Sequence, residues 1–297
     1  MKIRYLILSV IILLSGSCSP PPKINLPFDF DHPAEIIKLP QRLHEISGIT
    51  FYRKKELACV QDEKGIVFFY DIKKDKLRNN IPFGKDRDFE GITDVNDTLF
   101  VLCSNGEISE VDSKDENSLV NIYSTFLSKE NNCEGLCFDK KKHQLLVACK
   151  GRPKKGTAAK GMKAVYAFDL DKRELQRDPV YIIDPDSVQK NIVSTTSDNF
   201  FKRLFRKSTY EDTFLFEPSE ICIDPVTDDV YILSSVGKTF LALTYDGKIK
   251  FAVHLNPEIY KQPEGLAFSN DGSMFISDEG RGGKANLIKI NRIKNYD

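Results

Sequence analysis

The feature that most constrains the fold is a short motif that recurs along the chain with a period of about 44 residues. Five segments carry it: residues 45–50 (EISGIT), 88–93 (DFEGIT), 132–137 (NCEGLC), 218–223 (PSEICI) and 262–267 (QPEGLA). Alignment of the segments places one residue of each in a single column, at successive spacings of 43, 44, 86 and 44: Ser47, Glu90, Glu134, Glu220 and Glu264. Each motif precedes a polar turn, an apolar run, a second turn and another apolar run, which is typical of an all-β repeat protein. This period predicts the four-stranded blades of a β-propeller.

The spacing of 86 residues leaves five or six blades open. Two insertions account for most of the extra length, a Gly/Lys/Ala-rich segment at Lys150–Lys163 and a segment within Ser187–Phe216. The second insertion includes residues 198–207 (DNFFKRLFRK), whose apolar residues follow helical spacing. We therefore predict a propeller of five blades over residues 41–297 with one short helical insertion, and six blades is the alternative.

The N-terminus has the layout of a secretory signal peptide over residues 1–17. Lys2 and Arg4 precede an apolar run, Leu6–Leu14, that is too short to span a membrane. The small residues before Cys18 resemble a bacterial lipobox, in which the cysteine becomes the lipidated first residue. An ordinary signal peptide with a chance cysteine is the alternative. We predict that residues 18–40 form a lipidated tether and that the chain is anchored in the cell envelope, on the periplasmic side or the cell surface.

The charge balance bears on the class of binding partner, and the cysteine content bears on disulfides and metal sites. The chain has 43 basic and 43 acidic residues, so no basic excess indicates nucleic acid. Besides Cys18, six cysteines lie in or beside apolar runs: Cys59, Cys103, Cys133, Cys137, Cys149 and Cys222. An even number in an exported chain permits disulfides, but we favour burial as small apolar side chains. No Cys-x-x-Cys pair supports a zinc site.

The motif also predicts a site, because the first strand of each propeller blade lines the central channel. Its glycine would allow neighbouring strands to approach closely. Four carboxylates would then converge near one mouth, with Glu45 able to join them: Glu90, Glu134, Glu220 and Glu264. Two like charges about 6 Å apart repel by about 3 kcal/mol at an effective dielectric of about 20, so such a ring needs protons or a cation.

Oxygen ligands without His or Cys favour a hard ion, and calcium is the predicted cofactor. The alternative is that each glutamate caps backbone amides within its own blade.

A second polar column follows the second strand of each repeat: Asp62, Ser104, Lys150, Ser235 and Asp278. With their neighbours, these positions predict a binding surface at the channel mouth formed by Ser47, Asp62, Glu63, Asp278 and Glu279. Solvated loop ends are the alternative. His44, beside Glu45, is the only histidine that we place near the channel.

The C-terminal third carries a family resemblance in residues 217–225 (EPSEICIDP), 230–238 (VYILSSVGK), 262–268 (QPEGLAF) and 275–280 (FISDEG). The order and spacing of the motifs resemble the bacterial SdiA-regulated proteins over roughly residues 41–297. The resemblance implies a five-bladed propeller akin to NHL-repeat proteins, with a calcium site and no established activity. Ser47 in place of Glu, and Ile221 in place of Gly, depart from a symmetric ring.

Two functions remain open. The first is a membrane-held, calcium-stabilised module that binds an unknown small molecule or partner protein. The second is a calcium-dependent hydrolase of lactones or esters, which needs a base over the metal, and only Asp62, Asp278 and His44 are available. No Gly-x-Ser-x-Gly or His-Glu-x-x-His motif is present. We favour binding and assign no catalytic residue.

Overall fold

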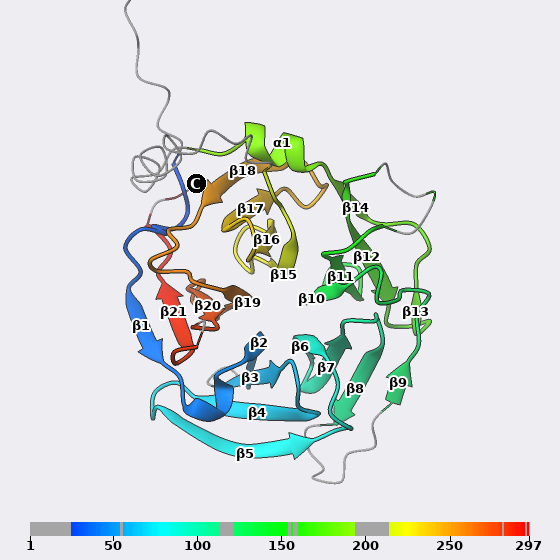
Figure 1. The fold of residues 1–297 in the computed structure, drawn as a ribbon, viewed down its shortest axis with the longest axis vertical. Coiled ribbons are helices and arrows are strands. Elements are labelled where there is room, and N and C mark those ends of the chain that lie inside the picture. Colours follow the sequence, from blue (N-terminus) through cyan, green and yellow to red (C-terminus); the bar gives the residue numbers. More distant parts are fainter. Residues whose placement is uncertain are drawn as a thin grey trace, which may run out of the picture.

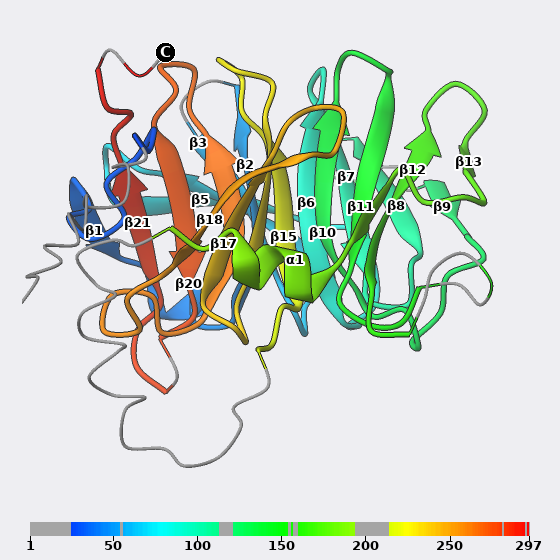
Figure 2. The same cartoon turned by 90° about the horizontal axis from the view of Figure 1, so that it is seen from above.

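The chain folds into five antiparallel sheets arranged around a central channel (Figure 1). The computed structural model describes residues 25–53, 56–112, 121–153, 156, 160–193, 214–280, 282–294 and 296. The strands run between the two faces of the disc, so the connecting loops gather at the two ends of the channel (Figure 2). The prediction of five blades is confirmed, and the alternative of six is wrong.

Blades 1 to 4 are meanders of consecutive strands, and the third carries one additional strand, whereas blade 5 is completed by the N-terminal strand. Blade 1 contains β2 (Ile46–Tyr52), β3 (Glu56–Gln61), β4 (Ile66–Asp71) and β5 (Lys76–Pro82). Blade 2 contains β6 (Phe89–Val95), β7 (Thr98–Cys103), β8 (Ile108–Asp112) and β9 (Asn121–Tyr123). Blade 3 contains β10 (Cys133–Asp139), β11 (Gln144–Cys149), β12 (Lys163–Asp169), β13 (Glu174–Leu175) and β14 (Tyr181–Ile183). Blade 4 contains β15 (Pro218–Ile223), β16 (Val230–Ser234), β17 (Thr239–Leu243) and β18 (Ile249–His254). Blade 5 contains β19 (Pro263–Phe268), β20 (Met274–Asp278), β21 (Asn286–Ile290) and β1 (Glu35–Lys38).

The hydrophobic core lies between the blades rather than at one centre. Five clusters of buried side chains each join two neighbouring blades. The second strand of a blade is covered on both faces, which explains why every residue of β11 is buried and why its sequence, QLLVAC, is almost continuously apolar. Apolar strand runs repeated at the blade period therefore produce a closed ring of interfaces.

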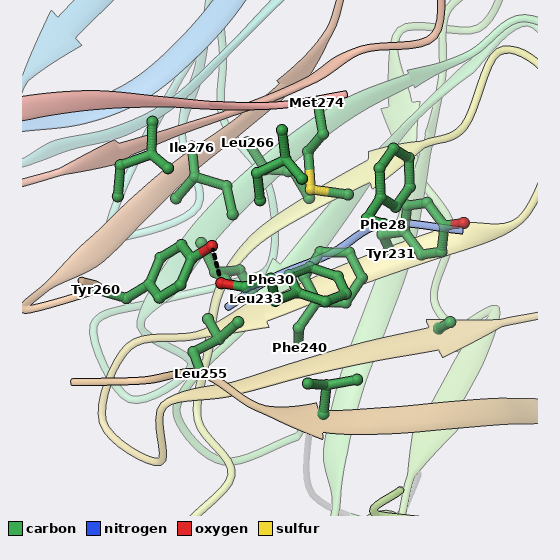
Figure 3. Packing of buried hydrophobic residues seen from close by; sticks show 14 of the residues in the cluster. Phe28, Phe30, Tyr231, Leu233, Phe240, Leu255, Tyr260, Leu266, Met274 and Ile276 are labelled. Atoms are coloured by element: carbon green, nitrogen blue, oxygen red, sulfur yellow. Dashed lines mark hydrogen bonds between the residues drawn. The ribbon is translucent and has the colours of Figure 1, made fainter. Parts of the chain in front are cut away.

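The ring is closed by the two ends of the chain. The N-terminal strand β1 pairs antiparallel with β21, where Ile36 lies opposite Ile288. Phe28 and Phe30, which precede β1, are buried between blades 4 and 5 (Figure 3). The Tyr260 hydroxyl donates a hydrogen bond of 2.9 Å to the Phe30 carbonyl. The sequence-based domain boundary at residue 41 was therefore misplaced, because residues 28–39 belong to the propeller and not to a tether.

A single short α-helix, α1 (Pro185–Lys190), occurs in the described part of the chain and packs near β18. Asp184 caps it by accepting a hydrogen bond from the amide of Asp186, and Pro185 occupies the first turn. The amphipathic helix predicted at residues 198–207 lies outside the described residues, as do the predicted signal peptide and Cys18. No helix of the ranges given above is long and apolar enough to cross a membrane.

Candidate functional site

The motif glycines permit close contact between the innermost strands, which are β2, β6, β10, β15 and β19 (Figure 1). A Cβ atom added to Gly91 would lie 2.9 Å from the amide nitrogen of Leu136 in blade 3. One added to Gly135 would lie 2.7 Å from the amide nitrogen of Ile221 in blade 4. The predicted close approach at these glycines is confirmed.

The residue before each of these glycines lies at a register shift. In blade 3, Cys133 pairs with Cys149 and Gly135 pairs with Ala148, so Glu134 stands between the paired positions, as in a β-bulge. The same shift occurs around Glu90 in blade 2 and Glu264 in blade 5. Three glutamates therefore occupy equivalent positions, and we call Glu90, Glu134 and Glu264 the carboxylate ring.

Blade 4 breaks this pattern. Pro218 pairs with Ser234 and Glu220 with Leu233, so Ser219 occupies the ring position and Glu220 takes the register of the glycine. The sequence alignment was therefore one residue out in this blade.

Glu220 is only 1% exposed, and its Oε1 accepts hydrogen bonds of 2.9 Å from the amides of Leu136 and Ile221. Glu220 therefore binds one backbone amide of its own blade and one of blade 3, so it joins two blades and does not cap its own blade alone. Its second oxygen, Oε2, is buried without a hydrogen-bond partner among the residues described.

In blade 5 the sequence alignment also differs by one residue from the strand register, here in the second polar column. Asp278 pairs with Pro263 and is fully buried, and its Oδ1 accepts a hydrogen bond of 2.6 Å from the Gln262 amide. The next residue, Glu279, is partly exposed and takes the register that Lys150 has in blade 3. The alignment of the second polar column was therefore one residue out in this blade, where Glu279 and not Asp278 is equivalent to Lys150.

Burial disfavours the ionised forms of the carboxylates in the ring. Burial, followed by the charges of Glu134 and Asp88, raises the pKa of Glu90 to about 10. Burial and the charge of Glu134 raise the pKa of Glu264 to about 7, and its Oε1 accepts a hydrogen bond of 3.1 Å from the Ser235 hydroxyl. Burial also raises the pKa of Glu134, although the Lys150 ammonium lies 3.2 Å from its Oε1. At neutral pH the ring therefore retains protons, with Lys150 as a neighbouring cation.

Outside the ring lies a second acidic group, the mouth cluster, which consists of Glu45, Asp62, Glu63, Asp88 and Glu279. Burial is the largest influence on Asp62, and the four neighbouring carboxylates add to it, raising its pKa to about 6. Glu45 also pairs with His44, with 3.2 Å between Oε1 and Nε2. The predicted mouth residues Asp62, Glu63 and Glu279 are thus close enough for their charges to interact, whereas Ser47 is buried in β2.

The sequence analysis did not identify two polar residues of the site, Asp88 and Asn132. The Asp88 carboxylate raises the pKa of both Glu90 and Asp62. The side-chain amide of Asn132 donates a hydrogen bond of 2.7 Å to Glu134. Each stands two residues before a ring glutamate, as Gln262 does before Glu264. That polar column was visible in the repeats and would have identified them.

The ring offers oxygen donors to a cation but is not a formed coordination sphere. No three His, Cys, Asp or Glu side chains in the described ranges lie close enough to hold a metal ion together. The raised pKa of Glu90 shows that its negative charge is not compensated in the ring. The carboxylate oxygens of the ring are therefore ligands suited to a hard cation, and the ring side chains would have to change rotamer to coordinate one together.

The raised pKa values predict a pH dependence of stability in the absence of divalent cations. Between its ordinary pKa of 4.5 and its folded pKa of about 7, Glu264 binds a proton more tightly in the folded than in the unfolded chain. Glu264 alone should therefore lower the stability by about 3 kcal/mol as the pH rises through this window. Urea denaturation at pH 5, 6, 7 and 8 in chelator measures the effect.

Glu264→Gln should make this fall in stability smaller without abolishing it, because Glu90, whose pKa is raised to about 10, still contributes over the same range. Substitution of the exposed Glu258 by Gln should leave the profile unchanged. A wild-type stability that is constant from pH 5 to 8 would contradict the assignment.

The fold and the site together define a five-bladed β-propeller with a ring of carboxylates of raised pKa in its channel. The chain belongs to the SdiA-regulated family, whose model matches residues 31–281. None of the curated proteins matches it.

Several solved structures share the fold at low sequence identity. A luciferin-regenerating enzyme is 11% identical with a TM-score of 0.54, over 89% of this chain and 96% of that one. A chain of a nidogen–laminin complex is 12% identical with a TM-score of 0.50, over 78% of this chain and 72% of that one. A chain of a mitotic checkpoint complex is 10% identical with a TM-score of 0.51, over 100% of both chains. Likeness at these identities shows the fold alone.

Proposed function

We propose that this protein is an exported binding module, anchored in the cell envelope by a lipid on Cys18, that takes up calcium at the carboxylate ring. Its mouth cluster then presents an acidic surface to a protein partner or a small-molecule ligand, and nucleic acid is not among its partners. The observation that supports the proposal most strongly is the set of three equivalent glutamates whose pKa values are all raised, chiefly by burial, with the charge of Glu134 adding to the shifts of Glu90 and Glu264.

The residues that would hold the ion are Glu90, Glu134 and Glu264, with the Ser235 hydroxyl beside Glu264. A calcium ion would supply the positive charge that protons and Lys150 now provide, and it would connect blades 2, 3 and 5 across the channel. Because the ion displaces protons, its affinity should increase as the pH rises.

The test is thermal unfolding of the full chain in mild detergent, in chelator and in millimolar calcium. Calcium should stabilise the wild type, by about 2.7 kcal/mol at one hundred times its dissociation constant. Glu134→Gln should weaken this dependence, whereas Glu130→Gln, at an exposed position in the loop before β10, should preserve it. Identical wild-type curves in the two buffers would remove calcium from the proposal.

The anchor is tested separately by labelling cells with a fatty-acid analogue and fractionating them. The Cys18→Ala variant should lose the label and leave the membrane fraction, because the thiol is the acylation point. A variant that still incorporates the label would contradict the lipid anchor.

A hydrolase is the second candidate, and the pKa of Asp62 favours it. A carboxylate with a pKa of about 6 at a channel mouth can accept a proton near neutral pH. A panel of lactones and aryl esters, assayed in calcium with wild type and Asp62→Asn, separates the two functions. Turnover that depends on Asp62 would support the hydrolase, and its absence over the panel would leave binding.

A further inference from the structure

Two buried cysteines lie against each other at the inner edge of blade 3. Cys133 begins β10, Cys149 ends β11, and the two residues are directly opposite in the register of the strands. Both side chains are fully buried, and their Sγ atoms are 3.8 Å apart.

The backbone hydrogen bonds show which kind of antiparallel pair this is. The Cys133 amide donates to the Ser104 carbonyl of blade 2, and the Lys150 amide donates to the Asn132 carbonyl. Cys133 and Cys149 therefore form a pair that is not hydrogen-bonded directly, for which Cα atoms are typically about 4.5 Å apart. That separation lies within the range of about 4.4–6.8 Å that a disulfide bridges. Rotation about the side-chain torsions can therefore bring the sulfurs to bonding distance.

We infer that Cys133 and Cys149 form a disulfide that crosses β10 and β11 when the chain folds under oxidising conditions. The inference rests on the geometry of blade 3 and is independent of calcium, the anchor and the proposed function. A weak hydrogen bond between two permanent thiols is the competing explanation of the same short distance.

The oxidant is a disulfide of low molecular weight, such as oxidised glutathione, or an enzyme carrying an equivalent disulfide. One protein thiolate attacks that disulfide, forms a mixed disulfide and releases one thiolate of the oxidant. The second protein thiolate then displaces the other half. The two cysteines lose two protons and two electrons, and the oxidant becomes two thiols. Both cysteines are fully buried in the folded blade and out of reach of an oxidant, so the exchange takes place before blade 3 has closed.

The bond would also fix part of the channel. Glu134 follows Cys133 and Lys150 follows Cys149, and these two neighbours form the ion pair of the carboxylate ring. A bond between the cysteines therefore holds the two backbones that position this pair. Cys137, the next cysteine in β10, instead accepts a hydrogen bond of 3.3 Å from the Ile223 amide of blade 4.

The experiment maps thiols in the full chain, refolded in detergent in a glutathione redox buffer and then alkylated. Trypsin places Cys133 and Cys137 in residues 130–140 and Cys149 in residues 143–150. Non-reducing digestion should give these two peptides joined and lighter by two hydrogen atoms, and reduction should separate them. The joined product should persist in Cys137→Ala and vanish in Cys149→Ala.

The oxidised wild type should also melt about 5–10 °C above the reduced protein, because the bond closes a short loop in the unfolded chain. Cys149→Ala should show no such difference. The digest of the wild type tests the disulfide without requiring any variant to fold. An alkylated 143–150 peptide from the oxidised protein would overturn the inference.

Discussion

Gly135→Val should lower the free energy of unfolding by about 3 kcal/mol or more, because there is no room for a side chain between blades 3 and 4. A Cβ at this position would lie 2.7 Å from the Ile221 nitrogen and 2.9 Å from backbone atoms of Glu220. The obstruction is backbone, which cannot rotate away as a side chain can, so the innermost strands must separate. Urea denaturation followed by circular dichroism measures the loss.

The matched control is Gly84→Ala, since nothing lies within 4 Å of a Cβ at that exposed position. Its stability should stay within about 0.5 kcal/mol of wild type. If Gly135→Val were as stable as the control, the blades would not depend on close contact at the motif glycines.

Phe30→Ala should cost about 3–5 kcal/mol, the usual range for truncating a buried aromatic side chain. The Phe30 ring lies 4.7 Å from the Phe240 ring between blades 4 and 5, where its removal leaves a cavity (Figure 3). The loss should appear as a lower midpoint in urea.

Ile36→Ala is the control from the same segment of the chain. Ile36 belongs to β1 but is 49% exposed, so its truncation should cost less than about 1 kcal/mol. Equal losses for the two variants would mean that the segment contributes through strand pairing and not through the buried phenyl ring.

The repeat was sufficient to predict the fold, because a blade leaves the same pattern of turns and apolar strands each time it recurs. It also identified Glu90, Glu134 and Glu264, where the motif keeps its glycine. It failed at Glu220, where the alignment followed the glutamate although pairing between β15 and β16 places Ser219 at the ring position. A register of this kind depends on the partner strand, which a one-dimensional alignment does not contain.

Two other differences between the sequence analysis and the structure have related causes. Asp278 and Glu279 are adjacent and chemically similar, so only the pairing of β19 with β20 shows which one is buried. Strand β1 is four residues long and mostly exposed, and its partner lies at the far end of the sequence. Neither local pattern nor the repeat period could therefore have revealed it.

The pairing of β1 with β21 sets an order of events in folding. Blades 1 to 4 each consist of strands that follow one another along the chain, so each can form from a local stretch. Blade 5 needs β1, which is synthesised first, and β21, which is synthesised last. Contacts between such distant segments form slowly because a long loop must close. Until then β1 has no partner strand, and the facing surfaces of blades 4 and 5 lack Phe28 and Phe30. The nearly complete propeller therefore exposes an unpaired strand and apolar surface just before closure, and both favour aggregation.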